Sequence, residues 1–350
     1  MSSDGRDRSA SANRVVQPRF RWVAWLRPAF GLGLLGALIL YVDFEVVLSQ
    51  LTHLATGWMF LAMACILVST LLGAFNVFLL MARSGNVSLG KFLPIYWVGW
   101  SLSLIVPGQV GDLAGISTLL RRHRYDWHQS LGPGFLDKFI SLVLMSALAA
   151  IGLTQTLGLD KRVRVLGLVA AVSLVAGGGL VIFAPRLWRR LFNPRGKGLR
   201  GLVGRTLGEM RRIATTHYVP LAANTALTVA KIVLTGGSYW AIFSGLGFGE
   251  VRLLDVVPLV AVSSLVAYIP VSFNGMGTAE AAGIFLFGRL GVTASGVVTT
   301  YLLLRITILV MAWVPSGLWL LIRGRGASCT GASAAVNCEA PSGSESKDLG

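Results

Sequence analysis

Six apolar stretches, each near or above the roughly 20 residues that cross a 30 Å hydrocarbon core, recur along the 350-residue chain. Hydrophobic residues make up 54% of the sequence and charged residues only 13%, a composition that excludes an ordinary soluble protein. The sequence therefore predicts an all-α polytopic membrane protein with six full transmembrane helices. The predicted spans cover residues 22–42, 57–82, 131–157, 165–185, 218–245 and 295–322.

Two further apolar regions are too short to cross a bilayer. Pro94–Val106 ends at Pro107-Gly108, Pro258–Ile269 ends at Pro270, and each is followed by a glycine-rich turn and another short apolar run. A proline–glycine interruption at membrane depth requires surrounding protein or water to satisfy the backbone. We therefore expect two re-entrant hairpins built from broken helices.

The two halves of the sequence resemble one another. The order of two spans, a broken hairpin and one charged span occurs in residues 22–157 and again in residues 165–322. Three full spans separate equivalent points, so the second copy would run in the opposite sense as an inverted repeat, an arrangement common in transporters. Chance similarity between apolar segments is the alternative interpretation.

The net charge of +16 is concentrated in short segments beside apolar ones, where Lys and Arg orient a membrane protein and attract anionic lipid. This distribution predicts cytoplasmic termini and a place in the inner membrane, and it gives no reason to expect nucleic-acid binding. Residues 1–21 form a basic cytoplasmic arm in this prediction, and residues 323–350, rich in Gly, Ala and Ser, form a disordered cytoplasmic tail. The basic loop 186–217 is expected to contain an amphipathic helix at the membrane surface.

Six ionisable residues fall within the predicted embedded segments. A charge exposed to lipid at mid-bilayer costs about 2.5–3.5 kcal/mol on the insertion scale, so these side chains should face the protein interior. Their spacing does not reveal which acid meets which cation, and a purely structural ion-pair network or snorkelling towards the interface is the alternative to a binding role. The six residues are Asp112, Asp137, Lys138, Lys231, Glu280 and Arg305.

The segment IPVSFNGMGTAE at 269–280 combines residue types that end one helix and begin another. Asn274 can cap a backbone, Gly275 and Gly277 permit a tight turn, and Glu280 opens the next helix. The amino end of such a helix presents free N–H groups that suit a phosphate or carboxylate. We therefore take the following as candidate contacts of a lipid headgroup: Asp112, Lys138, Asn274, Gly275, Gly277, Glu280 and Arg305. We identify no catalytic constellation, no metal-ligand spacing and no cofactor motif.

PVSFNGMGTAE at 270–280, PGQVGDL at 107–113 and FLDKFISLVL at 135–144 resemble the signature segments of the lysylphosphatidylglycerol synthase transmembrane-region family, also called flippase-like or UPF0104 membrane proteins. The resemblance covers roughly residues 20–322. Related sequences often place an arginine three residues after the first acid, where this chain has Gly115. The resemblance implies a protein that moves, or helps move, a polar-headed lipid or polyprenyl-linked molecule between leaflets.

The leading hypothesis is thus a lipid translocase-like membrane protein, with an anionic phospholipid or a polyprenyl-phosphate-linked molecule as its substrate. The alternative is a non-transporting scaffold or accessory subunit whose partner is an enzyme of lipid or cell-envelope polymer synthesis. Only 28 residues follow Ile322, so we do not expect this chain to act as an aminoacyl-transferring enzyme by itself.

Overall fold

The computed structural model describes residues 44–81, 87–105, 111–156, 198–268 and 275–336, together with Ser272 and scattered positions between 33 and 40 and between 162 and 196. Across these ranges the chain is helical and contains no strand. The predicted all-α class is therefore confirmed.

Four helices are long and apolar enough to cross a membrane, and they establish the chain as a multi-pass membrane protein. They are α3 (Thr56–Met81), α6 (Trp127–Thr156), α10 (Tyr218–Gly245) and α13 (Ala294–Val336). Each begins within four residues of the corresponding predicted span. The other two predicted spans, 22–42 and 165–185, fall largely outside the described residues.

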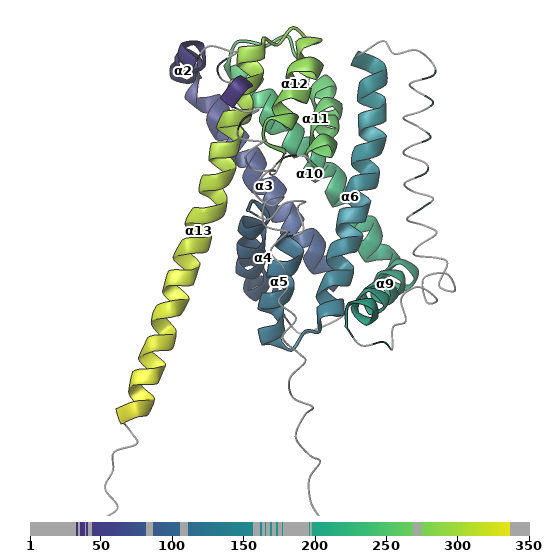
Figure 1. Cartoon of the computed structure of the whole chain (residues 1–350), viewed down its shortest axis with the longest axis vertical. Coiled ribbons are helices and arrows are strands. Elements are labelled where there is room, and N and C mark those ends of the chain that lie inside the picture. Colours follow the sequence, from purple (N-terminus) through teal and green to yellow (C-terminus); the bar gives the residue numbers. More distant parts are fainter. Residues whose placement is uncertain are drawn as a thin grey trace, which may run out of the picture.

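Two pairs of shorter helices occupy the regions where the sequence predicts hairpins. The first pair is α4 (Leu89–Ser103) and α5 (Gly111–Leu120), and the second is α11 (Leu253–Tyr268) and α12 (Thr278–Gly288). None of the four reaches the roughly 20 residues that a full crossing needs. In Figure 1, α4 and α5 lie in the lower half of the bundle and α11 and α12 in the upper half.

The structure corrects the starts of both interrupted regions. The apolar segments were expected to begin at Pro94 and Pro258, but α4 and α11 each begin five residues earlier and contain the proline internally. Proline removes one backbone hydrogen bond from a helix interior, and tertiary packing compensates for that loss here. Pro258 is buried against Gly152 of α6, where a Cβ would lie 2.5 Å from the Pro258 Cβ.

The helix contacts occur in equivalent sets across the two halves. The long helices α3 and α10 pack along one another, α6 packs on α11, and α13 packs on α4. The contacts of α5 with α6 are matched by those of α12 with α13, and the contacts of α4 with α5 by those of α11 with α12. Each short pair is therefore held between its own following long helix and the long helix of the other half.

Three further features surround this bundle. The short helix α2 (Phe44–His53) lies between the first two predicted spans, and a 3₁₀ turn (Arg121–His123) joins α5 to α6. The helix α9 (Leu199–Thr216) lies within the basic loop 186–217, with Ile213 and Met210 packed against α6.

The disordered tail was predicted to begin at residue 323, within the range of α13. α13 continues to Val336, and residues 337–350 lie outside the described part of the chain. A helix that is already formed extends at low cost because each added residue gains a hydrogen bond without new nucleation, so the change in composition at residue 323 does not end it.

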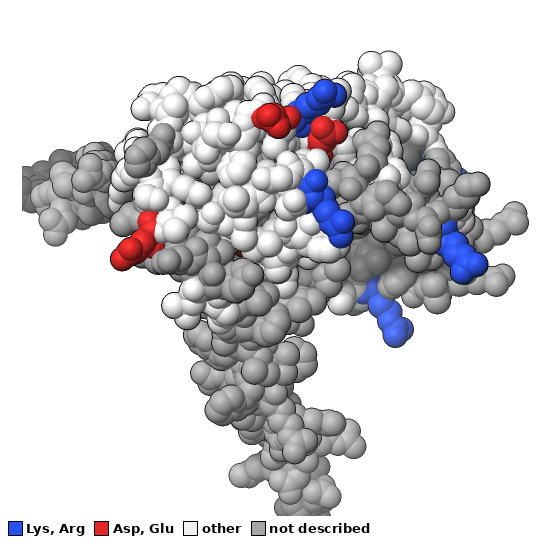
Figure 2. Space-filling view, turned by 90° about the horizontal axis from the view of Figure 1, so that it is seen from above, with Lys and Arg blue, Asp and Glu red and all other residues white. Residues whose placement is uncertain are grey.

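Charged side chains are unevenly distributed between the two ends of the bundle. Figure 2 views the end at which α2 and α12 lie, and its surface is mostly uncharged. The described Lys and Arg residues in the connections at that end are Arg162, Arg252 and Arg289. At the opposite end, the start of α4, the connections and α9 carry Lys91, Arg121, Arg122, Arg124, Arg200, Arg205, Arg211 and Arg212.

Candidate functional site

A cavity of about 390 Å³ lies among the long helices and the two short-helix pairs. Residues from α3, α4, α5, α6, α10, α11, α12 and α13 line it, so both halves of the chain contribute. The ionisable residues on its wall are Asp112, Asp137, Lys138, Lys231 and Arg305, and Glu280 is bonded to the last of these. The expectation that the six embedded charges face inward is therefore confirmed.

The first ion pair joins the short helix α5 to the long helix that follows it. Asp112 lies in the first turn of α5, and its Oδ2 is 2.7 Å from the Nζ of Lys138 on α6. Its other oxygen, Oδ1, accepts a hydrogen bond of 2.8 Å from the backbone N–H of Leu113. The carboxylate therefore stabilises both the amino end of α5 and the buried ammonium group.

The second ion pair occupies the equivalent position in the other half. Glu280, in the first turn of α12, accepts a hydrogen bond of 2.6 Å to its Oε1 from the Nε of Arg305 on α13. The Glu280 side chain has no exposed surface, whereas 21% of the Arg305 side chain remains exposed. The guanidinium therefore separates the carboxylate from the cavity and is the part of the pair that a ligand meets.

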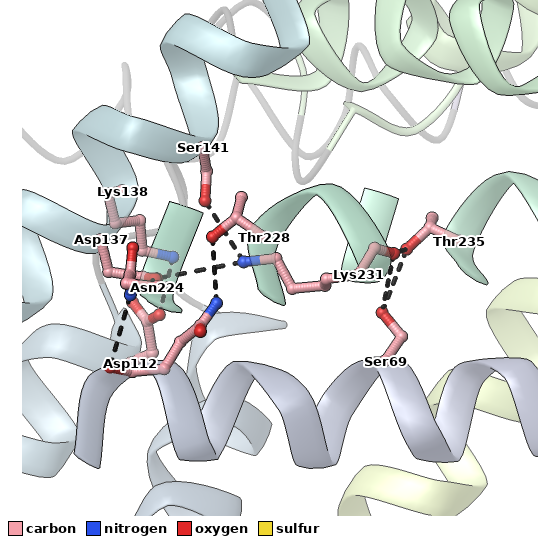
Figure 3. A network of polar contacts seen from close by, with 10 residues as sticks. Ser69, Asp112, Asp137, Lys138, Ser141, Asn224, Thr228, Lys231 and Thr235 are labelled. Carbon is pink, nitrogen blue, oxygen red and sulfur yellow. Dashed lines mark hydrogen bonds and ion pairs between the residues drawn. The ribbon is translucent and has the colours of Figure 1, made fainter. Parts of the chain in front are cut away.

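A third group of charges has no counterpart of this kind among the described residues of the second half. The Oδ1 of Asp137 accepts a hydrogen bond of 2.9 Å from Asn224, and its Oδ2 lies 4.0 Å from the Nζ of Lys231. The same ammonium donates to the Oγ of Ser141 at 3.2 Å. Figure 3 shows Lys231 extending from α10 towards Asp137 and Ser141 on α6. This ion pair is therefore much longer than the other two.

Polar contacts between α3 and α10 extend the same group. Asn76 on α3 donates to the Oγ1 of Thr228 at 3.0 Å. The hydroxyls of Ser69 and Thr235 lie 3.1 Å apart (Figure 3). Buried polar side chains of this sort persist in a membrane core because they form hydrogen bonds within the protein, although the Oδ1 atoms of Asn76 and Asn224 accept none from the described residues. The seam between the two halves is thus polar where it borders the cavity.

The turn before α12 requires its glycines. Gly275 and Gly277 adopt φ values of 71° and 77°, which side chains other than glycine rarely adopt, and a Cβ on Gly275 would lie 2.6 Å from the Cβ of Ala267. The hydroxyls of Ser272 and Thr278 lie 2.9 Å apart across the turn. Asn274, predicted to cap this turn, falls outside the described residues.

Gly115, where related sequences often carry arginine, is buried between α4 and α5. A Cβ there would lie 3.1 Å from the Cα of Gly99. In turn, a Cβ on Gly99 would lie 2.5 Å from the Cγ1 of Ile116 and 3.1 Å from the carbonyl oxygen of Asp112. In this chain, the position serves close helix packing and offers no side chain to the cavity.

The candidate headgroup residues chosen from the sequence included both tight ion pairs but left out Asp137 and Lys231. Their partners on α10 and α6 were also missed. A usable signal was present: polar residues recur along α10 at helical spacing within an apolar span, at Asn224, Thr228, Lys231 and Thr235. Such a stripe marks the face of a helix that borders a polar interior.

The arrangement can hold a polar or charged group inside an apolar bundle. Three acids and three cations surround the cavity, so their formal charges cancel when it contains no ligand. An entering anion can replace a carboxylate as the partner of a cation, because Arg, Lys and backbone N–H groups all bind phosphate.

Comparison with known proteins identified one family. The family model described as "Lysylphosphatidylglycerol synthase TM region" matches residues 25–316. The matched range includes both ion pairs, the third group of charges and both short-helix pairs. No curated protein and no solved structure matched the chain.

Proposed function

The chain belongs to the lysylphosphatidylglycerol synthase transmembrane-region family, and from this premise we propose that it moves a polar-headed lipid or polyprenyl-linked molecule between the leaflets of a membrane. The observation that carries the proposal is a cavity lined by ion pairs within a bundle whose outer surface is apolar. Phe60, Phe285 and Val310 leave large exposed hydrophobic surfaces of the sort that face lipid chains. A headgroup can thus occupy the polar interior while its chains remain in the bilayer.

In the proposed mechanism, the headgroup phosphate replaces a carboxylate as the partner of a cavity cation. The two tight pairs lie at the amino ends of α5 and α12, where helix dipoles add positive potential. When the cavity is empty, Asp112 and Glu280 neutralise Lys138 and Arg305. This exchange of partners lowers the energetic cost of carrying a charge through a low-dielectric core.

We infer a six-span inverted repeat with two re-entrant hairpins, so that the two halves alternate in opening the cavity to either side. Support comes from the equivalent helix contacts and from the opposite ends of the bundle at which the two short-helix pairs lie. The end rich in Lys and Arg is the cytoplasmic one in this proposal, in an inner membrane. The activity is transport rather than catalysis.

Purified protein in vesicles provides the test. Vesicles contain a trace of an acyl-labelled phosphatidylglycerol, and dithionite added outside reports how fast lipid from the inner leaflet becomes accessible. The double variant Glu280→Gln/Arg305→Gln removes the charges of the buried pair while it retains groups that can hydrogen-bond to each other. We expect it to lose most of the lipid movement that the wild-type protein supports.

The matched control is Glu209→Gln/Arg212→Gln, which neutralises an ion pair on α9 outside the cavity. A hydrogen bond to Glu209 raises the pKa of Arg212, but 46% of the Arg212 side chain is exposed, and pairs of this kind contribute about 0.2–1 kcal/mol. We expect wild-type rates from this control. Equal rates of lipid movement for the wild type and Glu280→Gln/Arg305→Gln would refute the role assigned to this ion pair. If lipid moves no faster in vesicles with wild-type protein than in protein-free vesicles, the scaffold alternative is favoured.

A further inference from the structure

Asp137 and Lys231 form the only one of the three cavity ion pairs, among the described residues, that is stretched to 4.0 Å. Lys231 directs an ammonium group with three N–H donors into the cavity, where Ser141 accepts one at 3.2 Å. The other two cations are held at 2.7 and 2.6 Å by their acids. An anion that enters the cavity therefore disrupts a weaker ion pair at Lys231 than at Lys138 or Arg305.

Displacement at Lys231 leaves Asp137 without its ion-pair partner, since the neighbouring Lys138 is held by Asp112. Asp137 is a buried residue with 7% of its surface exposed, and its remaining contact is the amide N–H of Asn224. A buried carboxylate that loses its counter-charge is stabilised by taking up a proton, because burial disfavours the charged form. Binding of the anion at Lys231 and protonation of Asp137 are thus linked.

The charge of the whole cavity leads to the same conclusion. Three acids and three cations balance in the empty cavity, so a bound monoanionic headgroup adds one uncompensated negative charge. One proton restores neutrality before the charge crosses the apolar core.

The other groups around Asp137 are not the acceptor of that proton. Asp112 is already held by Lys138 and by a backbone N–H, and Glu209 of α9, beside Gly132, is paired with Arg212. Among the described residues, the other titratable or polar groups near Asp137 are Lys138, which is paired with Asp112, Tyr96 of α4, Tyr268 of α11 and Asn224 of α10.

We propose that each lipid anion is carried together with one proton, that Lys231 binds the anion and that Asp137 binds the proton. This inference rests on the proposed translocation and adds its driving force and its substrate class, a lipid with a single net negative charge at the headgroup. The reaction is an electroneutral symport. At equilibrium, each unit of pH difference across the membrane then concentrates the lipid about tenfold in the leaflet facing the more alkaline side.

The test uses phosphatidylcholine vesicles with a trace of acyl-labelled phosphatidylglycerol, an imposed pH difference, and a membrane potential clamped to zero with potassium and valinomycin. Dithionite reports the fraction of label in the outer leaflet. We expect wild-type protein to move the label towards the alkaline side by about tenfold per pH unit. Asp137→Asn, which keeps an oxygen for Asn224, should distribute the label evenly, whatever its rate.

Asp126→Asn is the matched control, because Asp126 is an exposed aspartate outside the cavity, near the start of α6. It should concentrate lipid as the wild type does. Wild-type protein that moves lipid yet leaves it evenly distributed under the gradient overturns the proton coupling and leaves the proposed function standing. An absence of lipid movement by the wild type overturns both.

A second measurement covers the case in which Asp137→Asn does not fold. Wild-type protein in weakly buffered detergent with a pH indicator receives phosphatidylglycerol or an uncharged glycosyl diacylglycerol. We expect uptake of about one proton per bound phosphatidylglycerol and none with the uncharged lipid. Equal proton uptake for the two lipids, or none for either, refutes the role of Asp137.

Discussion

Removing the guanidinium of Arg305 should destabilise the protein far more than removing both members of its ion pair. Arg305→Met leaves Glu280, which has no exposed surface, as a buried carboxylate without its cation. Breaking a buried pair in this way typically costs about 3–5 kcal/mol, whereas replacing both partners is close to neutral or stabilising. Because 21% of the Arg305 side chain borders the cavity, water can enter the vacated space, and we expect a cost near the lower bound, about 3 kcal/mol.

A free energy of this size changes the unfolding equilibrium by roughly a hundredfold, since about 1.4 kcal/mol corresponds to a factor of ten. Unfolding in mixed micelles, followed by tryptophan fluorescence against increasing dodecyl sulfate, measures the difference. Adding Glu280→Gln to Arg305→Met should restore most of the lost stability. Equal stabilities for Arg305→Met and the wild type, or a double variant less stable than Arg305→Met, would contradict the assignment of a buried, charge-compensated pair.

The same unfolding assay tests the glycines. Gly275→Ala should lower the free energy of unfolding by about 2–4 kcal/mol, because the left-handed conformation and the contact with Ala267 both penalise a Cβ. Gly247→Ala, at a φ of 96° in open space, should lower it only by the backbone contribution of about 1–2 kcal/mol. Equal losses of stability would argue against tight packing of the turn. Gly99→Ala should destabilise by about 1–3 kcal/mol through the contact with Ile116, whereas Gly90→Ala in the same helix should stabilise by up to about 1 kcal/mol, and a gain at both positions would exclude the close approach of α4 and α5.

The sequence was sufficient to predict the elements that depend on local physics. A run of about 20 apolar residues defines a membrane helix with little help from the rest of the chain, and the predicted 218–245 span coincides with α10. The separation of α4 from α5 and of α11 from α12 was predictable from the local proline and glycine residues. Local signals failed at the starts of α4 and α11, because proline was taken to mark the start of each helix. The hydrogen bond lost at Pro258 is offset by packing on Gly152, which is more than 100 residues away.

The pairing of charges could not be predicted because it depends on how the helices cross. The separations from Asp112 to Lys138 and from Glu280 to Arg305 are nearly equal, and the structure makes both into ion pairs. The contact between Asp137 and Lys231 joins helices of different halves, and no spacing along the chain indicates it. A periodic pattern places a side chain on one face of a helix, but the partner opposite that face is set by tertiary structure.

The proposed translocation requires a headgroup to enter the cavity, and lipid protection of a cavity cysteine tests this step most directly. Ser264→Cys places a thiol on the cavity wall in a background without Cys65, Cys329 and Cys338. A water-soluble, negatively charged thiol reagent should modify it, and phosphatidylglycerol should slow that reaction while leaving a thiol at the exposed Thr216 unaffected. A cavity thiol that does not react, or that reacts equally fast with and without the lipid, would contradict the central claim.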